Sequence, residues 1–470
     1  MRGTLALLLA TGCAQLLGID ETSGPKGAAS LALDRVSVGA TVVTAPLDLA
    51  APPEFVLGDG SEVAGAAGEP GTWTTTSSGT AAMIYTAPDL PMPYQHDLAL
   101  GAAVQGNFIA FEHPDPRPAP GASIVLAVTL PGVYAAGESF EIAAIGAWTQ
   151  HVLAGGELPT LGASQLSASI PYTSFTATTS SPPARIAMAD AVLVLRYDGA
   201  ALSGVFIAPP FDQSDTSDTL SGTMIAVTAD TQLSAMIDPT TVATRFDAVV
   251  PAGSTPGLAW QLAAAPGYAA GVTTGVTLLS GAPAMTDTTF SGSYANPLAT
   301  LGWKPALTYV ASASRTVTLG GATVALGTEL AMVVDPGAGL VLDLPAGLPT
   351  MTSLAGMPLT SDGMTLSVDP GQPLPVAITA DKPDATLYHA LVEELAVVGT
   401  SATQTPVIDL VGTSPMLTLP PNVLQRGHTY AIVASCVQGG YPNAGSGDLR
   451  TFALPLAIGS ATSAAFTIAP

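Results

Sequence analysis

The chain has 470 residues and a formal net charge of −23, with only 12 Lys and Arg residues against 35 Asp and Glu residues. So few basic groups cannot neutralise a run of phosphates, which excludes nucleic acid as a partner and adhesion to anionic lipids through basic patches. Charged residues make up 10% of the chain, against about 25% in an average soluble protein. At about 100–200 residues per domain, this length predicts several domains.

The N-terminus carries the features of an export signal. Arg2 supplies a positive charge, residues 4–10 form an apolar run, and a glycine precedes Cys13. This pattern resembles the lipobox of bacterial lipoproteins, in which the signal peptide is removed and the new N-terminal cysteine is acylated. The resemblance implies a signal peptide over residues 1–12, a lipid on Cys13 and, because Ala14 follows, attachment to the outer membrane. The alternative is a secreted or periplasmic protein in which Cys13 is incidental.

Residues 13–30 are expected to form a short tether between the lipid and the folded part of the chain, because they contain many small and polar residues. The stretch 15–22 resembles the start of mature surface lipoproteins of myxobacteria. If Cys13 is acylated, the second cysteine, Cys436, has no disulfide partner within the chain. The fold must then be held together by packed apolar faces.

Beyond the tether, short apolar or alternating runs bounded by Gly, Pro, Asn and Asp predict β-strands almost throughout. We therefore predict an all-β chain built from tandem β-sandwich domains. The predicted units are an N-terminal β-domain over residues 31–118, a middle β-domain over 119–285, a further β segment over 286–347 that packs with the middle domain, and a C-terminal β-sandwich over 348–470.

Turn residues predict two hairpins. Gly320-Gly321 lies between two alternating runs, which is a strong hairpin pattern. Gln105-Gly106 also lies between two such runs and predicts a second hairpin at the end of the N-terminal domain. The segment 388–398 is the best candidate for a helix, but its alternation favours a strand.

A run near the C-terminus resembles a known family. Leu424, Gly427 and Tyr430 have the spacing Leu-x-x-Gly-x-x-Tyr, which is similar to the start of strand F in fibronectin type III domains. The resemblance implies that residues 348–470 form such a sandwich, with the hydroxyl of Tyr430 bonded to the backbone at the preceding corner. We expect that hydroxyl to satisfy a backbone carbonyl. We also expect Cys436, on the same face of the strand, to be a buried and unreactive thiol.

A search for catalytic and cofactor motifs finds none. The patterns G-x-S-x-G, H-E-x-x-H, G-x-x-x-x-G-K and C-x-x-C are absent, so we expect no cofactor. An acidic loop offers a weak candidate for calcium, because Asp212, Asp215 and Asp218 supply the hard oxygen ligands that this cation binds. Their spacing does not match an EF-hand, and a solvated loop is the alternative.

These patterns predict a lipoprotein of the cell envelope that is not an enzyme and has a binding or structural role. Its partner would be a protein or a glycan at the cell surface, which no motif identifies. The alternative is an envelope hydrolase with a site in residues 121–345. Such a site requires a convergent cluster of Asp, Glu or His in a closed pocket of that region.

Overall fold

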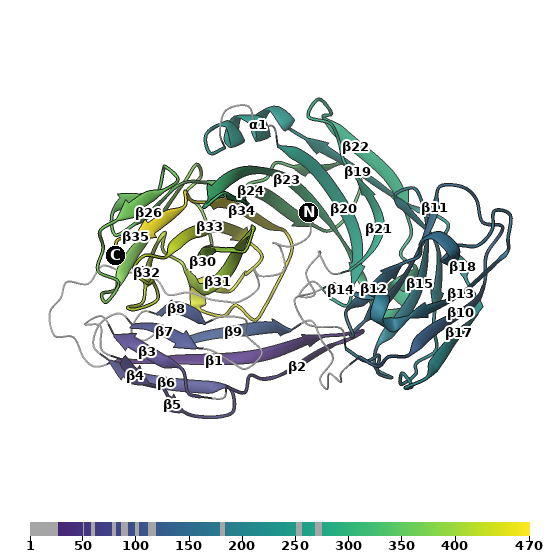
Figure 1. Cartoon of the computed structure of the whole chain (residues 1–470), viewed down its shortest axis with the longest axis horizontal. Helices are drawn as coiled ribbons and strands as arrows, with labels where there is room; N and C mark the ends of the chain where they lie inside the picture. The colour runs from purple at the N-terminus through teal and green to yellow at the C-terminus, as the bar shows by residue number, and fades with distance from the viewer. Residues whose placement is uncertain are drawn as a thin grey trace.

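The structure is a computed structural model that describes residues 27–49, 51–57, 62–77, 81–85, 93–98, 103–110, 119–178, 184–250, 256–267 and 275–470. Cys13, the predicted signal peptide and most of the predicted tether lie outside the described residues. The protein is all-β, as predicted, and the only α-helix in the described part of the chain is α1 (Pro239–Asp247) (Figure 1). That helix is too short to cross a membrane.

The N-terminal sheet is built around β1 (Gly27–Val38), which runs along one side of the molecule in Figure 1. β1 is antiparallel to β2 and β6 and parallel to β9. The strands of this sheet besides β1 are β2 (Val42–Pro46), β5 (Ala66–Ala67), β6 (Thr72–Ser77) and β9 (Ala103–Ala110). Because β1 begins at Gly27, regular structure starts inside the predicted tether.

The hairpin predicted at Gln105-Gly106 is wrong. Both residues lie inside β9, which continues through them and runs parallel to β1, with Leu33 opposite Gly106. A Gln-Gly pair is a local turn signal, but here a ladder of eight residue pairs with β1 determines the backbone conformation. The strand before it, β8 (Tyr94–Leu98), pairs instead with β7 (Ala81–Tyr85) and with a strand of the C-terminal region.

A β-sandwich with its own core follows. The sheet β13–β10–β17 packs against β12, β11, β15 and β16 through buried residues such as Ile124, Phe140 and Val194. The strands of this part are β10 (Ser123–Thr129), β11 (Glu138–Ile145), β12 (Thr149–Val152), β13 (Gln165–Pro171), β14 (Thr176–Ala177), β15 (Ala191–Asp198), β16 (Ala201–Ile207), β17 (Ser217–Thr223) and β18 (Ile225–Ala226).

The central part has two layers that share a core containing Phe246, Leu262 and Tyr309. Its strands are β19 (Thr231–Ile237), β20 (Gly257–Ala265), β21 (Val276–Gly281), β22 (Thr289–Tyr294), β23 (Lys304–Leu319), β24 (Ala322–Val334) and β25 (Leu340–Leu342). The hairpin predicted at Gly320-Gly321 is confirmed, because β23 and β24 pair with Leu319 opposite Ala322. The φ angles of +54° and +93° at the two glycines explain the residue choice.

The C-terminal part consists of two facing sheets, with the orders β27–β26–β29–β32 and β31–β30–β33–β34. Val376, Ile432 and Phe466 belong to the core between them. The segment 388–398 is a strand, as its alternation predicted. The strands are β26 (Pro349–Leu354), β27 (Met357–Pro358), β28 (Met364–Leu366), β29 (Leu374–Ala380), β30 (Leu387–Val398), β31 (Ser401–Gly412), β32 (Met416–Leu419), β33 (Thr429–Gly439), β34 (Leu456–Thr462) and β35 (Phe466–Ile468).

One 20-stranded sheet links the sandwich, the central part and the C-terminal part, and the sheet built around β1 is separate from it. From the sandwich it runs through β15, β16, β21, β20, β23 and β24 to β34, β33, β30 and β31. It then continues through β8 and β7 to β3 (Glu54–Leu57) and β4 (Glu62–Ala64). The ladder between β24 and β34 joins the central part to the C-terminal part, so the predicted boundary near residue 348 does not interrupt the sheet.

An ion pair between Arg245 and Asp381, whose side chains are 8% and 23% exposed, fastens α1 to the C-terminal part. Arg245, near the end of α1, makes two hydrogen bonds to the carboxylate of Asp381, one of them 3.0 Å long, and donates to the carbonyl of Leu344 at 2.6 Å. Asp381 also accepts the amide of Leu348 at 2.6 Å. Burial alone would raise the pKa of Asp381, but the Arg245 and Leu348 hydrogen bonds and the charges of Arg245 and Lys382 outweigh it and hold that pKa below its usual value.

Removing either partner should destabilise the fold. Asp381→Asn is expected to lower the free energy of unfolding at pH 7 by about 2–4 kcal/mol, because it leaves the buried guanidinium of Arg245 without its counter-charge. Arg245→Met should lower it by less, because the carboxylate of Asp381 is more exposed. The folded pKa of Asp381 is lowered, so this contribution is present above the unfolded pKa and is lost as the pH falls through the folded one. Urea denaturation at pH 7 and at about pH 3 should therefore show that the difference in free energy of unfolding between the wild type and Asp381→Asn becomes smaller in acid.

The control is the ion pair between Arg426 and Asp369, whose side chains are 51% and 62% exposed. Asp369→Asn should change the free energy of unfolding at pH 7 by less than about 0.5 kcal/mol. Equal effects of the two substitutions would contradict a structural role for the Arg245 pair.

Candidate functional site

A line of polar side chains crosses one face of the continuous sheet. Ser312 of β23 is opposite Glu329 of β24, and Glu329 is opposite Ser460 of β34. Ser460 is opposite Ser435 of β33, which in turn is opposite His389 of β30. Directly opposed residues of antiparallel strands share a face, with Cβ atoms about 4.5–5.5 Å apart. We call these five residues, together with Asp409, the polar row.

Asp409 of β31 lies at the inner end of the polar row. Its Oδ1 is 3.6 Å from Nδ1 of His389, and both side chains are 4% exposed. Within the described part of the chain, this Oδ1 has no hydrogen-bond partner. The hydroxyl oxygens of Ser435 and Ser460 are 2.8 Å apart. The side chains across the sheet therefore follow the order Asp, His, Ser, Ser, Glu, Ser.

His389, Ser435 and Asp409 of the polar row are buried, whereas Ser312, Glu329 and Ser460 are half-buried. Burial raises the pKa of Glu329 to about 6. Burial and, secondarily, the charge of Asp409 raise the pKa of Tyr94, whose backbone in β8 pairs with Asp409. The carboxyl group of Glu329 should therefore exchange its proton near pH 6.

Asp409, His389 and Ser435 are ordered like a nucleophilic triad, but their surroundings do not suit acyl transfer. β33 is bordered by β30 on one side and β34 on the other, so the backbone N–H groups near Ser435 belong to ladders. They are not free to form an oxyanion hole. The arrangement is better suited to holding and exchanging protons.

A second polar group lies in the sandwich, inside residues 121–345. Nε2 of His151 is 2.9 Å from Oε2 of Glu157, and Nδ1 is 3.3 Å from Oγ of Ser174. Oε2 of Glu157 also accepts the amide of Ala154 at 3.0 Å. Burial opposes ionisation of Glu157, but the hydrogen bonds from Ala154 and His151 prevail and lower its pKa. We call His151, Glu157 and Ser174 the His151 group.

In the neutral form of His151, Glu157 favours the tautomer with the proton on Nε2. Nδ1 then faces both the hydroxyl and the carbonyl oxygen of Ser174, each 3.3 Å away. The hydroxyl of the exposed Ser174, however, donates to the carbonyl of Pro171 at 2.7 Å. The His151 group thus has a nucleophile, a base and an orienting acid within reach of one another. The serine proton points to a backbone oxygen instead of to the base.

The structure does not bring the three candidate calcium ligands together. Each carboxylate is engaged by a different partner: Asp212 by the amide of Met188, Asp215 by Arg185, and Asp218 by the amide of Ser214. A search of the described residues finds no group of three or more His, Cys, Asp or Glu that could hold a metal ion.

Leu424, Gly427 and Tyr430 form the corner that leads into β33. Tyr430 is 1% exposed, and Gly427 turns the chain with a φ of +80°. The hydroxyl of Tyr430 accepts a hydrogen bond of 2.9 Å from the amide of Gln425, so the prediction of a carbonyl partner was wrong. The same strand buries Cys436 completely, and burial, followed by the charge of Asp381, raises the pKa of this thiol to about 12.

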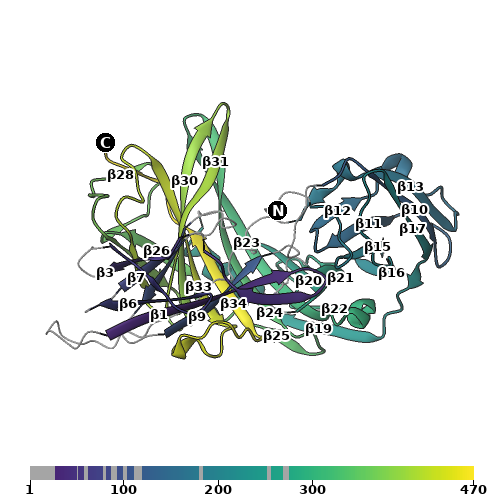
Figure 2. The same ribbon diagram turned by 90° about the horizontal axis from the view of Figure 1, so that it is seen from below.

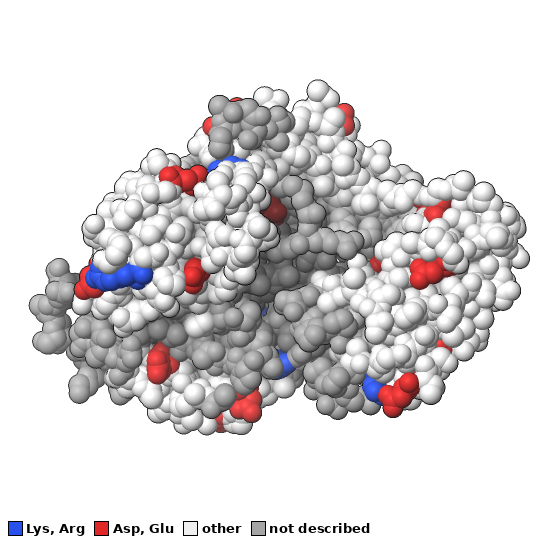
Figure 3. All heavy atoms as spheres, viewed as in Figure 1, with Lys and Arg blue, Asp and Glu red and all other residues white. Residues whose placement is uncertain are grey.

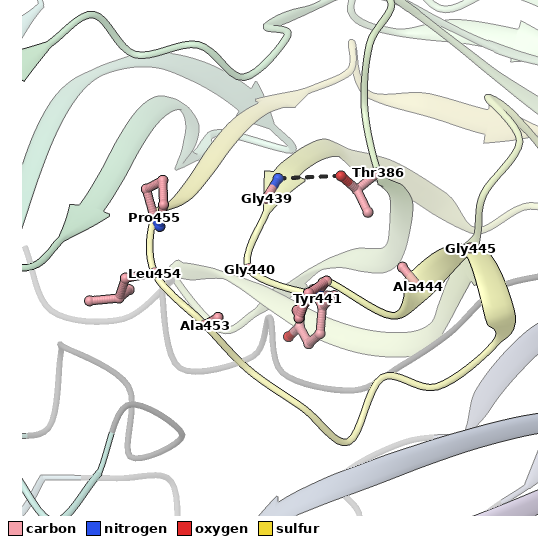
Figure 4. A pocket seen from close by; sticks show the side chains of 10 residues that line it. Thr386, Gly439, Gly440, Tyr441, Ala444, Gly445, Ala453, Leu454 and Pro455 are labelled. Carbon is pink, nitrogen blue, oxygen red and sulfur yellow. Dashed lines mark hydrogen bonds between the residues drawn. The ribbon is translucent and has the colours of Figure 1, made fainter.

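The loop between β33 and β34 encloses a pocket of about 420 Å³ (Figure 4). Thr386, Gly439 and Pro455 belong to its lining, and no charged residue does. The hydroxyl of Tyr441 is buried from solvent and has no hydrogen-bond partner in the described part of the chain. The pocket therefore has space for a small molecule but no charged side chain for acid–base catalysis.

Neither the polar row nor the His151 group matches a sequence motif, because their residues become neighbours only in the folded protein. The members of the polar row come from strands between residues 312 and 460, and only the strand register aligns them. Alternation along β30 indicates that His389 and Leu391 share a face, but the sequence does not reveal which residues face them. The His151 group depends in the same way on the pairing of β12 with β11 and β14.

Comparisons with known proteins find no matching family model and no matching curated protein. Among solved structures, one match is Escherichia coli alpha-2-macroglobulin activated by porcine elastase, with a TM-score of 0.15 and 10% sequence identity. The match covers 95% of this chain and 44% of that chain.

The hydrogen bond between the amide of Gln425 and the hydroxyl of Tyr430 can be tested by removing that hydroxyl. Tyr430→Phe should lower the free energy of unfolding by about 1–3 kcal/mol, because the amide of Gln425 then loses its acceptor in a part-buried position. Urea denaturation would measure this. In the same samples, native Cys436 should resist a thiol reagent until the protein unfolds. A neutral Tyr430→Phe substitution or rapid labelling of the native thiol would contradict the packing of β33.

Proposed function

We propose that the protein is a lipoprotein of the cell envelope with a binding or structural role, held in the outer membrane by a lipid on Cys13. The N-terminal sequence supports the anchor, since a short apolar run is followed directly by a glycine and the cysteine. The alternative is a secreted or periplasmic protein. Figure 3 adds that acidic residues form scattered spots on the face it shows, with few basic residues among them.

The observation that carries the binding or structural role is the continuous sheet. A ladder network that links the sandwich, the central part and the C-terminal part makes a scaffold, and such scaffolds carry their functional surfaces on projecting loops and hairpins. The β30–β31 hairpin projects from the body in Figure 2. At its tip Val397 and Val398 are 42% and 65% exposed. This tip is the surface that we assign to a protein or glycan partner at the cell surface.

The C-terminal part is proposed to be a module of the fibronectin type III kind. Its strand order supports this, because β26, β29 and β32 face β31, β30, β33 and β34, as strands A, B and E face C′, C, F and G in that family. The position of Tyr430 at the start of β33, with its hydroxyl bonded to the backbone five residues upstream, supports it as well. Such modules commonly serve as spacers or binding units, which agrees with the proposed role.

The anchor is tested by Cys13→Ala. Acylation by more than one chain gives stable membrane attachment, whereas a single chain is marginal. The variant should therefore move from the membrane fraction to the soluble fraction. Retention of the variant in membranes after an alkaline carbonate wash would reject the lipid anchor.

The binding role is tested by placing a photo-crosslinking amino acid at Val398 in cells. We expect a discrete crosslinked product with one envelope component. The matched control is Leu161, which is 69% exposed but lies in the sandwich, and it should give no such product. No product from either position, or the same product from both, would contradict a partner at the hairpin tip.

A second candidate function, an acyl hydrolase, is favoured by the His151 group. Oγ of Ser174 would bond to the carbonyl carbon of an ester while its proton passes to Nδ1 of His151. That proton would then go to the leaving alcohol as the ester C–O bond breaks, and water would release the acyl group from Ser174. This path requires the Ser174 hydroxyl to turn from Pro171 towards His151.

A fluorophosphonate probe tests this second candidate, because it reacts only with an activated serine. Labelling at Ser174, found by mass spectrometry and lost in His151→Asn, would support a hydrolase. Ser169→Ala, which alters an exposed serine of the same sandwich, should leave the labelling unchanged. Unlabelled wild-type protein would remove the hydrolase from consideration.

A further inference from the structure

The ladder between β24 and β34 is the seam between the central and C-terminal parts. It contains six residue pairs, from Thr328 opposite Ala461 to Val333 opposite Leu456. A small apolar cluster that includes Ala306 and Val437 packs across it. The polar row crosses this seam between Glu329 and Ser460.

Glu329 is half-buried and differs from the charged residues that are buried with a partner. Arg196 and Arg245 are buried with ion-pair partners, Glu138 and Asp381. The carboxyl group of Glu329 has no hydrogen bond or ion pair within the described residues, although it lies between the hydroxyl-bearing Ser312 and Ser460. An ionised carboxylate in this position is poorly solvated, whereas a neutral carboxyl group can be buried at lower cost and can also donate a hydrogen bond.

From this geometry we infer that Glu329 is a proton-operated latch, which takes up a proton in mild acid and then binds Ser460 across the seam. The donor would be the carboxyl O–H, and the acceptor would be Oγ of Ser460, which already lies 2.8 Å from Oγ of Ser435. The hydrogen-bonded chain would thus extend from β24 through β34 to β33. In neutral solution the carboxyl group loses its proton and the latch opens.

The linkage between proton binding and folding determines how the stability of the seam changes with pH. Burial raises the pKa of Glu329 to about 6, from an ordinary value of 4.5. A group with a raised folded pKa contributes stability that is fully present below the unfolded pKa and is lost as the pH rises through the folded one. The seam should therefore tighten as the pH falls from about 7 to about 5, which is opposite to the effect of Asp381 at lower pH.

Other titratable groups face the polar row and must be separated from Glu329. His389 and Asp409 occupy the inner end, on β30 and β31. Burial raises the pKa of Glu393 on β30, which accepts a hydrogen bond from Gln404, and Tyr94 lies beside Asp409. Of these groups only Glu329 belongs to a strand of the seam, so a measurement confined to β24 and β34 distinguishes it.

The test is hydrogen exchange of backbone amides in β24 and β34 at pH 5.0 and 7.5, corrected for the intrinsic effect of pH on exchange. In the wild type, protection of these amides should rise by about tenfold at the lower pH. Glu329→Gln, which keeps a neutral donor at every pH, should show high protection at both values. The amides of β10 (Ser123–Thr129), in the separate sandwich core, should not follow this pattern.

Two further variants keep the proposal testable if Glu329→Gln folds poorly. Ser460→Ala removes the acceptor but leaves the carboxyl group half-buried, so it should reduce the gain at pH 5.0, while Glu393→Gln should leave the gain at the seam in place. Wild-type protection that does not change with pH would overturn the latch, and so would a full gain in Ser460→Ala.

Discussion

The backbone ladder between β24 and β34 is the contact on which the rest of the architecture depends. Without it, β24 and β34 would each expose an unpaired edge, and unpaired backbone groups are costly to bury and prone to non-native pairing. Side-chain ion pairs on either side of this ladder also stabilise the fold. Arg315 of β23 pairs with Asp362 and donates to the carbonyl of Ser463, while Arg245 fastens α1 to Asp381. This chain has few aromatic residues, and its fold is therefore stabilised by the continuous backbone hydrogen bonds of the sheet as well as by packed cores.

Local patterns predicted the strands well, because alternation and turn residues act over a few positions. The turn at Gly320-Gly321 and the strand character of residues 388–398 are both decided within a single hairpin. The segment around Gln105-Gly106 was mispredicted because its partner, β1, lies some 70 residues earlier in the chain. Parallel pairing over such a separation leaves no local signature that a short window can detect.

The candidate sites were missed for the same physical reason. A histidine and two serines on separate strands have no motif, and they become neighbours only after the register of these three strands is set. The corner around Tyr430 could be found from its spacing, since its residues lie within one turn. Even there the direction of the hydrogen bond was mispredicted, because a hydroxyl can donate or accept and the sequence does not show which backbone group it meets.

The geometry of β1 has a mechanical consequence. This strand begins the described part of the chain and is held along its length by β9 in parallel and by β6 in antiparallel register. At its end, the indole N–H of Trp148 donates to the carbonyl of Val38, and two residues further on the indole N–H of Trp303 donates to the carbonyl of Ala40. A force applied at Gly27 along the strand axis would load these ladder bonds together in shear, instead of opening them one after another. The first strand of the fold is therefore placed to resist tension that enters through the N-terminus.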